Sequence, residues 1–470
     1  MVSLRSAAAF LLNDNVGRGL LGIVTIFFAV SVARTTLACL PGSVTFAVLS
    51  VMLGFVAVSY VSLVSFGRVR VHMGTGLDLS RVFDRMPTAK RAPRPPIWAY
   101  GRHVQFAPWI AYNLLSSWLS PLRYERQVFR VSQLLDKSKP RSKNNPRSMD
   151  DDVVISYFPP PGKSLPLDAP AIFIDVGLTC TAQDIPGSSF PRVAVSRGFR
   201  VVVIERRGHA FPLKLPRMNL FGDADDVEQI FLEVQRRLPE APFFWLGISS
   251  GSKLPIQAMG MFDERRKNGD ASAPRFVATA NLCPGYNLET CFTGFGFPYK
   301  YLCLSSVKTK FLIENEAVLR DHDAQAYERA IKAKDLQSLL CHAAPFAGYP
   351  SAKEYYAAEN PVLYAPLMTT PTLIINSEDD PLTVVSLCYG KMPGSDDGLT
   401  FVEMVERSPC GMLLISPSGS HCPFLDGAVL PFSCLPKALG AIVISSWADA
   451  CVLEFFEGYL VELREGKSRE

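Results

Sequence analysis

Six short apolar runs, each bounded by turn residues, alternate with longer helical stretches from about residue 150 onwards. Strands that are buried on both faces have this composition, and their alternation with helices implies parallel pairing through right-handed crossovers. The sequence therefore predicts an α/β fold with a mostly parallel, doubly wound sheet over residues 151–283 and 369–465. The runs cover residues 171–176, 199–204, 242–246, 276–282, 371–376 and 411–415.

One connection between these runs is too long for a crossover. It covers residues 284–368 and is rich in aromatic residues and helix formers. Connections of this length inside a compact domain usually have a structure and a function of their own. We therefore expect residues 284–368 to form a lid that is inserted into the core.

The N-terminal segment is apolar enough to enter a membrane. Residues 35–67 carry no charged side chain and neither do residues 19–33. Stretches of about 20 such residues span a hydrocarbon core of roughly 30 Å. Residues 1–66 are therefore predicted to be a membrane anchor with one or two transmembrane helices. A two-helix hairpin, one span after an amphipathic or re-entrant segment, and a signal peptide before one span all remain open.

Charge is distributed unevenly along the chain. Residues 67–150 carry 16 Lys and Arg against five Asp and Glu, a net charge of +11, whereas the whole chain has only +4. This basic neck and N-terminal extension follows the predicted anchor directly. By the positive-inside bias, it predicts that the large C-terminal part lies in the cytosol and that the protein lies at a membrane. The small total charge does not favour a nucleic-acid partner.

Cofactor and metal motifs are missing from the sequence. The 11 cysteines are odd in number and include no C-x-x-C pair, so they fit neither a dense disulfide framework nor a zinc knuckle. No G-x-G-x-x-G, Walker A or H-E-x-x-H pattern occurs. We therefore expect no cofactor and no metal, and scattered free thiols are typical of a reducing compartment.

The motif that indicates chemistry is G-I-S-S-G at residues 247–251. It follows an apolar run and precedes a helical stretch, which is the strand–turn–helix context of a nucleophile elbow. A serine on such a tight turn has strained backbone angles, so the residues two positions away on each side must be small. Ser249 is the predicted nucleophile, because its hydroxyl would project near a helix N-terminus where negative charge is favoured.

Two partners for Ser249 follow it in the chain order that this kind of elbow requires, an acid and then a histidine. The run ending at residue 376 leads into S-E-D-D-P, and the run ending at residue 415 is followed by His421. His421 is the predicted general base. We favour Asp380 as the carboxylate that orients it, with Asp379 as the alternative.

An oxyanion hole needs two backbone N–H groups that point at one oxygen. Ser250, directly after the nucleophile, is expected to supply one of them. The other is expected from Leu178, in the turn G-L-T after an earlier strand.

These motifs resemble the membrane-anchored α/β-hydrolase-domain family that includes the bacterial YheT-like hydrolases and the yeast medium-chain ethyl ester synthases. The resemblance covers roughly residues 95–430 and implies the α/β-hydrolase fold. It also implies a serine hydrolase that acts on lipid esters, with Ser249, Asp380 and His421 as its catalytic triad. Seven blocks occur in the family's order, at 177–179, 202–209, 211–217, 238–252, 348–356, 371–381 and 419–427.

The sequence departs from the family at two places. Val176 precedes the G-L-T turn where many relatives have His or Pro, and the nucleophile is followed by S-G-S rather than M-G-G. Neither change removes a backbone donor, so neither argues against activity. Both bear on the shape of the acyl pocket, so the preferred acyl chain length stays open. Asp426 also forms an H-x-x-x-x-D pattern with His421, which is either linked to acyl transfer or a structural carboxylate.

The expected function is cleavage of a lipid acyl ester, such as a monoacylglycerol or a phospholipid, at the bilayer surface. An acyltransferase and a non-catalytic lipid-binding protein are the alternatives. Five lid aromatics either line an acyl pocket or form the core of the lid: Phe292, Phe295, Phe297, Tyr299 and Tyr301. Arg206 and Arg207 are expected to fix a turn near the oxyanion hole, and Cys180, Cys283 and Cys422 to lie near the pocket mouth.

Overall fold

A computed structural model describes most of the chain that follows the predicted anchor. The anchor itself, residues 1–66, lies outside the described residues. Among the helices of the described part, none combines the length and the apolar character needed to cross a bilayer. The described residues are 67–95, 102–103, 105–106, 109, 121–184, 189–392, 398–426 and 446–467.

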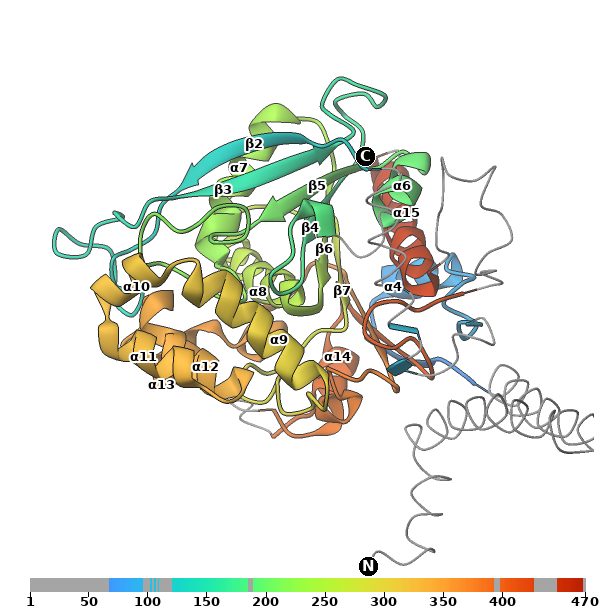
Figure 1. Ribbon diagram of the computed structural model, residues 1–470. Coiled ribbons are helices and arrows are strands. Elements are labelled where there is room, and N and C mark those ends of the chain that lie inside the picture. Colours follow the sequence, from blue (N-terminus) through green and yellow to red (C-terminus); the bar gives the residue numbers. More distant parts are fainter. Residues whose placement is uncertain are drawn as a thin grey trace, which may run out of the picture.

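A nine-stranded sheet in the order β1-β9-β8-β7-β6-β4-β5-β3-β2 forms the centre of the described part (Figure 1). Strands β4 to β9 pair in parallel, whereas β3 runs antiparallel to β2 and β5, and β1 runs antiparallel to β9. The sheet is therefore mostly parallel, as predicted. The strands are β1 Arg70–Met73, β2 Glu125–Val131, β3 Asp151–Phe158, β4 Ala171–Asp175, β5 Arg200–Glu205, β6 Phe243–Ile248, β7 Ala278–Leu282, β8 Thr372–Ser377 and β9 Gly411–Ser416.

Helices cover both faces of this sheet. On β4, Ile172 and Ile174 pack against one set of helices, and Phe173 between them packs on the opposite face. The first set is α4 (Leu77–Asp84), α6 (Ser189–Ser196) and α15 (Trp447–Lys467). The second is α7 (Ala224–Arg237), α8 (Lys253–Lys267) and α14 (Phe401–Arg407). Burial on both faces explains why the parallel strands read as continuous apolar runs.

The structure differs from expectation in the segment 67–150, which contributes β1 and β2 to the sheet. Both strands lie at edges of the sheet. Exposed and partly covered residues alternate along most of β2, E-R-Q-V-F-R-V, with Arg126, Val128 and Arg130 exposed and the residues between them partly covered. A half-exposed edge strand of this kind lacks the continuous apolar run that marked the parallel strands.

The inserted segment 284–368 connects β7 to β8 and is mostly helical (yellow and orange in Figure 1). Its side chains form an apolar cluster together with residues of the loop that precedes α7. Its helices are α9 Tyr299–Val307, a π-helical turn at Lys308–Ile313, α10 Glu316–His322, α11 Ala324–Lys332, α12 Leu336–Ala343 and α13 Ala352–Glu359, followed by 3₁₀ turns at Pro361–Leu363 and Ala365–Leu367.

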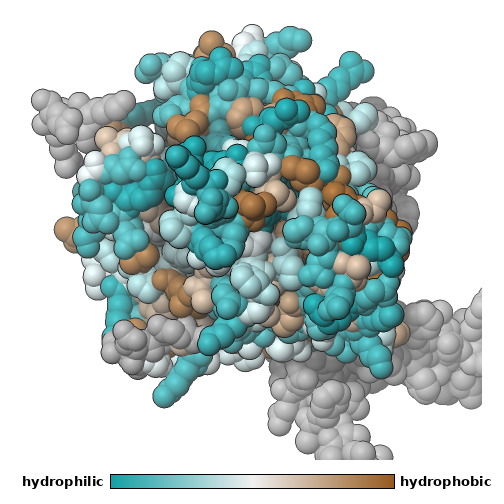
Figure 2. All heavy atoms as spheres, turned by 90° about the vertical axis from the view of Figure 1, so that its left-hand side faces the viewer, coloured by the Kyte–Doolittle hydropathy of each residue, from teal (hydrophilic) through white to brown (hydrophobic). Residues whose placement is uncertain are grey.

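One surface of the described part is largely hydrophilic, with hydrophobic residues scattered among the polar ones (Figure 2). Scattered apolar side chains are ordinary on a surface that faces water. The described residues that carry chemistry instead gather at one edge of the sheet.

Candidate active site

The carboxyl ends of three parallel strands hold Ser249, Asp380 and His421. Ser249 follows β6 directly, Asp380 lies shortly after the end of β8, and His421 lies in the turn after β9. Because these strands run in parallel, their carboxyl ends meet at one edge of the sheet. The structure thus brings together three side chains that are separated by up to 172 residues in the sequence.

His421 lies between the other two side chains. Its Nε2 is 2.7 Å from Ser249 Oγ, and its Nδ1 is 2.8 Å and 3.0 Å from the two carboxylate oxygens of Asp380. A carboxylate only accepts hydrogen bonds, so Nδ1 carries the proton and Nε2 is free to accept one from the serine hydroxyl. We call these three side chains the row. In it, His421 can remove the hydroxyl proton of Ser249.

Close backbone contacts form the turn that carries Ser249. Its φ of 54° lies in the left-handed region, which is strained for a serine. A side chain at Gly247 would place a Cβ 2.5 Å from Ser252 Cα, and one at Gly251 would place it 2.4 Å from the Asp175 carbonyl oxygen. The two glycines of the motif are therefore required by space, as the sequence predicted.

Asp380 makes contacts in addition to those with His421. Its Oδ1 accepts the backbone N–H groups of Leu382 at 2.7 Å and Thr383 at 2.9 Å. These bonds fix the carboxylate in the turn that follows β8. The side chain is also buried, so its orientation relative to the imidazole is set by the fold.

Asp379, the alternative acid, contacts the backbone near the histidine and not the imidazole. Its Oδ1 accepts the N–H groups of Gly419 and Ser420, both at 2.8 Å, and its Oδ2 accepts the Ser418 hydroxyl at 3.3 Å. Asp379 therefore holds the turn that leads into His421. The two neighbouring acids thus contact different parts of the site.

The charge of Asp380 changes the proton affinity of His421. Burial disfavours the charged imidazolium, but the adjacent carboxylate outweighs this and raises the pKa of His421 to about 10. The arrangement therefore stabilises the imidazolium that forms when His421 takes a proton from Ser249.

The turn of Leu178 lies beside the nucleophile. A Cβ built on Gly177 would be 3.7 Å from Ser249 Cβ, and the Leu178 side chain packs on the apolar cluster of the lid. Thr179 has a φ of 61°, so the turn is tight. The backbone of Leu178 and that of Ser250 thus lie in segments that adjoin Ser249, where the predicted oxyanion donors belong.

A buried arginine braces that turn. Arg206 donates to Asp175 at 3.3 Å and to the Gly177 carbonyl at 3.4 Å. Asp175 also accepts the indole N–H of Trp245 at 3.2 Å. Burial raises the pKa of Asp175 to about 6, although Arg206 opposes the rise. These contacts agree with the expected role of Arg206 in fixing the turn.

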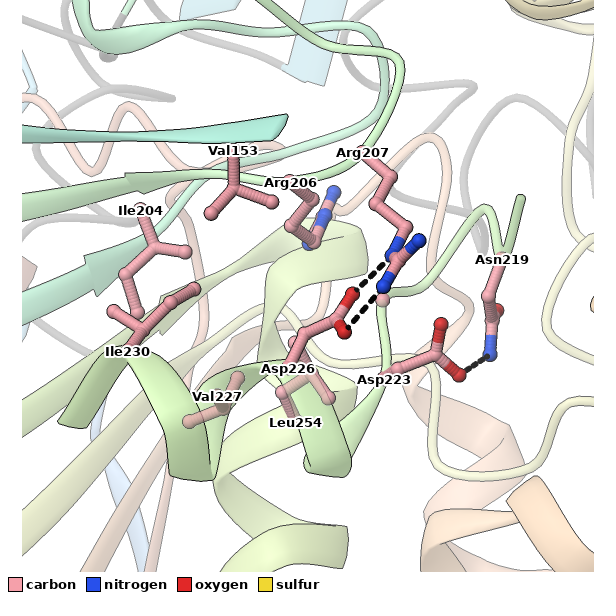
Figure 3. Close-up of a pocket in the computed structure, with 11 residues that line it drawn as sticks. Val153, Ile204, Arg206, Arg207, Asn219, Asp223, Asp226, Val227, Ile230 and Leu254 are labelled. Atoms are coloured by element: carbon pink, nitrogen blue, oxygen red, sulfur yellow. Dashed lines mark hydrogen bonds and ion pairs between the residues drawn. The ribbon is translucent and has the colours of Figure 1, made fainter. Parts of the chain in front are cut away.

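Arg207 has a different partner. It donates to both carboxylate oxygens of Asp226, at 2.7 Å and 3.0 Å (Figure 3). It also donates to the Met149 carbonyl at 2.8 Å. This bidentate pair joins the end of β5 to α7. Arg207 therefore fastens the core and not the oxyanion turn.

A second group of buried charges joins the lid to the core, which we call the lid–core cluster: Lys137, Asp223, Lys253 and Glu359. Lys137 binds Glu359 at 3.0 Å and also contacts Asp223, and Lys253 contacts Glu359. Each of the four side chains is at most 10% exposed. Lys253 directly follows the elbow turn, so the cluster fastens the lid next to the nucleophile.

Two thiols lie against His421. The sulfurs of Cys283 and Cys422 and a ring nitrogen of His421 are all within 4.8 Å of one another. Cys283 is fully buried and Cys422 is 7% exposed. The sequence analysis placed both thiols near the pocket mouth but found no ligand spacing, since Cys283 follows β7 whereas Cys422 follows β9.

The lid aromatics divide into two kinds. Phe292 and Tyr299 are buried, and Phe295 packs partly against the lid core, whereas Phe297 is 82% and Tyr301 is 61% exposed. The expectation of one shared environment for all five is therefore wrong. The two exposed rings neither line a pocket nor form a core, because more than half of each faces solvent.

An aromatic residue of the basic segment, Phe106, also reaches the site. Its ring centroid is 6.4 Å from that of His421 and 5.5 Å from that of Tyr299. Sequence reasoning missed it, since an isolated Phe in an irregular basic stretch carries no signal.

Asp426 lies outside the row of Ser249, His421 and Asp380. Its carboxylate binds the Arg91 guanidinium through both oxygens and accepts the Arg94 backbone N–H at 2.9 Å. These contacts tie the segment after His421 to the basic neck. They favour the structural reading of the H-x-x-x-x-D pattern.

No family model matches the chain. It is similar to the human protein ABHD15, at 26% identity over 56% of this chain and 50% of that protein. It is also similar to human phospholipase ABHD3, at 22% identity over 81% of this chain and 85% of that protein. Mouse monoacylglycerol lipase ABHD2 matches at 24% identity over 57% of this chain and 60% of that protein. The chain thus spans between 50% and 85% of the length of these relatives.

Solved structures give weaker matches. Est1E from Butyrivibrio proteoclasticus, with bound ferulic acid, is 14% identical with a TM-score of 0.36, over 58% of this chain and 88% of that one. The α/β-hydrolase enzyme MGS-M2, from a deep-sea metagenome library, is 15% identical with a TM-score of 0.35, over 65% and 94%. The chain's own strand order and elbow identify its fold.

Proposed function

We propose that this chain, whose relatives are α/β-hydrolase-domain proteins as its motifs predicted, is a membrane-anchored serine hydrolase of lipid acyl esters. The observation that carries the proposal is the row Ser249–His421–Asp380, with hydrogen-bond distances of 2.7 Å and 2.8 Å. Two relatives are named as a phospholipase and a monoacylglycerol lipase, which supports ester cleavage.

The proposed reaction begins with attack of Ser249 Oγ on the ester carbonyl carbon. His421 Nε2 takes the hydroxyl proton, and Asp380 stabilises the resulting imidazolium. The backbone N–H groups of Leu178 and Ser250 bind the negative oxygen of the tetrahedral intermediate. When this intermediate collapses, His421 returns the proton to the leaving alcohol and an acyl-enzyme remains.

Water completes the reaction. His421 takes a proton from the water, whose oxygen attacks the acyl carbonyl, and a second tetrahedral intermediate forms in the same oxyanion hole. Its collapse returns the proton to Ser249 Oγ and releases the fatty acid. The contacts of Asp426 with Arg91 give no support to a second pathway in which an alcohol replaces the water.

A lipid substrate follows from the walls of the site and from the N-terminal sequence. Phe106 and Tyr299 bring apolar surface next to His421, and such surface suits an acyl chain better than a polar one. The apolar stretches of residues 1–66 would keep this site at a bilayer, with the catalytic part in the cytosol. Monoacylglycerols and phospholipids are the proposed substrate classes.

The test is labelling by a fluorophosphonate, which reacts only with an activated serine. Membranes that contain the wild-type chain, Ser249→Ala, His421→Ala or Ser272→Ala are compared at equal protein level. Ser272 lies in an exposed turn after α8 and serves as the matched serine control.

We expect label in the wild type and in Ser272→Ala, and none in the other two. Fatty acid release from monoacylglycerol and phospholipid vesicles, with and without added alcohol, then identifies substrate and acceptor. A folded wild-type protein that takes no label would overturn the catalytic proposal.

A further inference from the structure

His421 is the base of the proposed reaction, but Cys283 and Cys422, which pack in the apolar cluster on one face of the sheet, have no role in that reaction. Both cysteines adopt left-handed backbone angles, with φ of 50° for Cys283 and 80° for Cys422. Ser420, which directly precedes His421, has a φ of 55°. Such angles are costly for residues other than glycine and persist only where the surrounding structure imposes them. The fold therefore holds two thiols beside one imidazole at buried positions.

These three groups are the donors that zinc prefers. Thiolate and imidazole ligands select zinc and similar soft divalent cations over magnesium and calcium. In a tetrahedral zinc site the ligand atoms lie roughly 3.5–4 Å apart. The three atoms here are already within 4.8 Å of one another, so an approach of about 1 Å would close the site.

The structure assigns to Cys283, Cys422 and His421 a binding site for zinc or a similar soft divalent cation, whose occupancy blocks the reaction centre. Each thiol binds as a thiolate and releases its proton to solvent, and the fourth position is left for water.

Blocking follows from the two hydrogen bonds that His421 already makes. Both ring nitrogens are engaged, so a metal ion must displace either Ser249 from Nε2 or Asp380 from Nδ1. The bond to the neutral hydroxyl is the weaker of the two, and we expect Nε2 to bind the metal. Asp380 would then orient the metal-bound imidazole, an arrangement that is common around zinc. Either displacement deprives Ser249 of its base.

Metal binding is tested without any reference to activity, on the full chain in detergent and under reducing conditions. Co²⁺ is titrated into Ser249→Ala protein, and the thiolate-to-cobalt charge-transfer absorption is recorded. We expect these bands at one cobalt per chain, and we expect them to vanish when Cys283→Ser or Cys422→Ser is added. Cys291→Ser is the matched control, since Cys291 is a buried thiol in the lid cluster.

Absence of the bands in the folded Ser249→Ala protein would overturn the metal site, and so would their persistence in both cysteine variants. Circular dichroism establishes that each variant is folded, and Cys283→Ala and Cys422→Ala replace any serine variant that is not. This arm stays informative even if the proposed hydrolase activity fails.

Inhibition is tested on the active protein and rests on the proposed function. Zn²⁺ at buffered free concentrations is expected to stop ester cleavage and fluorophosphonate labelling, and EDTA is expected to restore both. Measured against each variant's own metal-free rate, the half-inhibitory concentration should rise about tenfold or more in Cys283→Ser and Cys422→Ser. It should stay unchanged in Cys291→Ser. Equal inhibition of all four proteins would overturn the proposal, as would cobalt binding without inhibition by zinc.

Discussion

Two groups of buried side chains adjoin at the elbow turn, which carries Ser249 and leads into Lys253. They differ in how their charges are matched. In the lid–core cluster two ammonium groups face two carboxylates, and each carboxylate has further donors: Tyr349 donates to Glu359 at 2.6 Å and Gln133 to Asp223 at 2.7 Å. In the row at the sheet edge, one carboxylate faces one imidazole, and the imidazole contacts a neutral hydroxyl. In the cluster every charged group has an opposite charge beside it, whereas the row ends at a neutral hydroxyl that can react.

The pKa values of Asp223 in the cluster and His421 in the row differ in a corresponding way. Burial opposes the ionisation of Asp223, but Lys137 and Lys253 outweigh it and hold the pKa of that carboxyl well below its usual range. Asp223 therefore stays ionised at any pH near neutrality. The pKa of His421 is raised instead, so the row changes its protonation within the alkaline range. A fully matched cluster stabilises the fold, and a partly matched row is available for chemistry.

The largest effect is expected from removing the reactive end of the row. Ser249→Ala should lower kcat for ester cleavage by roughly a millionfold, because neither attack nor acyl-enzyme formation is then possible. The denaturation midpoint should stay within error of the wild type. Activity and urea denaturation are measured on the same preparations. A retained rate above about 1% of the wild type would show that the row is not the reaction centre.

Asp380→Asn should lower kcat by about ten-thousandfold, because the amide favours the wrong imidazole tautomer. It should also move the pH profile. The neutral imidazole is the base, and its raised pKa makes the wild-type rate climb with pH towards about 10. Without the carboxylate that pKa falls, so the residual rate should reach its plateau at lower pH. A pH–rate profile of both proteins measures this, and an unshifted acid limb would contradict the assignment of Asp380.

Glu359→Ala should lower the stability and leave the chemistry largely intact, which is the reverse of the effect expected for Ser249→Ala. It leaves Lys137 and Lys253 with one carboxylate between them in a buried site, which costs about 3–5 kcal/mol of unfolding free energy. The protein that remains folded should keep its kcat within about tenfold, since no reacting group changes. Glu264→Ala, at an exposed position on α8, is the control and should leave stability unchanged. Loss of activity without loss of stability would contradict the assignment of stability to the cluster and of chemistry to the row.

Asp379→Asn is expected to have the smallest effect. The amide oxygen still accepts from Gly419 or Ser420, so the loss of charge should cost about 1 kcal/mol and lower kcat about tenfold. Unlike Asp380→Asn, it should keep the acid limb of the wild-type pH profile. A shift as large as that of Asp380→Asn would mean that the two acids share one role.

The parallel part of the fold was predictable because burial on both faces leaves long apolar runs in the sequence. Each of the six runs matches a strand within two residues at either end. The antiparallel strands β1, β2 and β3 escaped prediction. Two are sheet edges in a basic segment, and β2 mixes charged, polar and apolar residues over only seven positions, without a continuous apolar run.

The side chains of the row were predictable from chain order, and the choice between Asp379 and Asp380 was not. Both acids follow β8 directly, and only their contacts separate them. Lys137 is a similar case. It stands in the run K-S-K-P-R-S-K, which composition marks as solvated, yet its side chain is 10% exposed and binds Glu359 from a distant part of the sequence. Long-range partners of this kind leave no local pattern.

The position of the lid has an evolutionary consequence. The lid begins after the carboxyl end of β7 and ends before the amino end of β8, and these two strands pair in parallel as direct neighbours. A segment inserted between two neighbouring strands can lengthen, shorten or change its sequence without altering the sheet that holds Ser249, Asp380 and His421. Selection can therefore alter which molecules reach the serine while the chemistry stays the same, so the variable and the constant parts of such an enzyme evolve at separate rates.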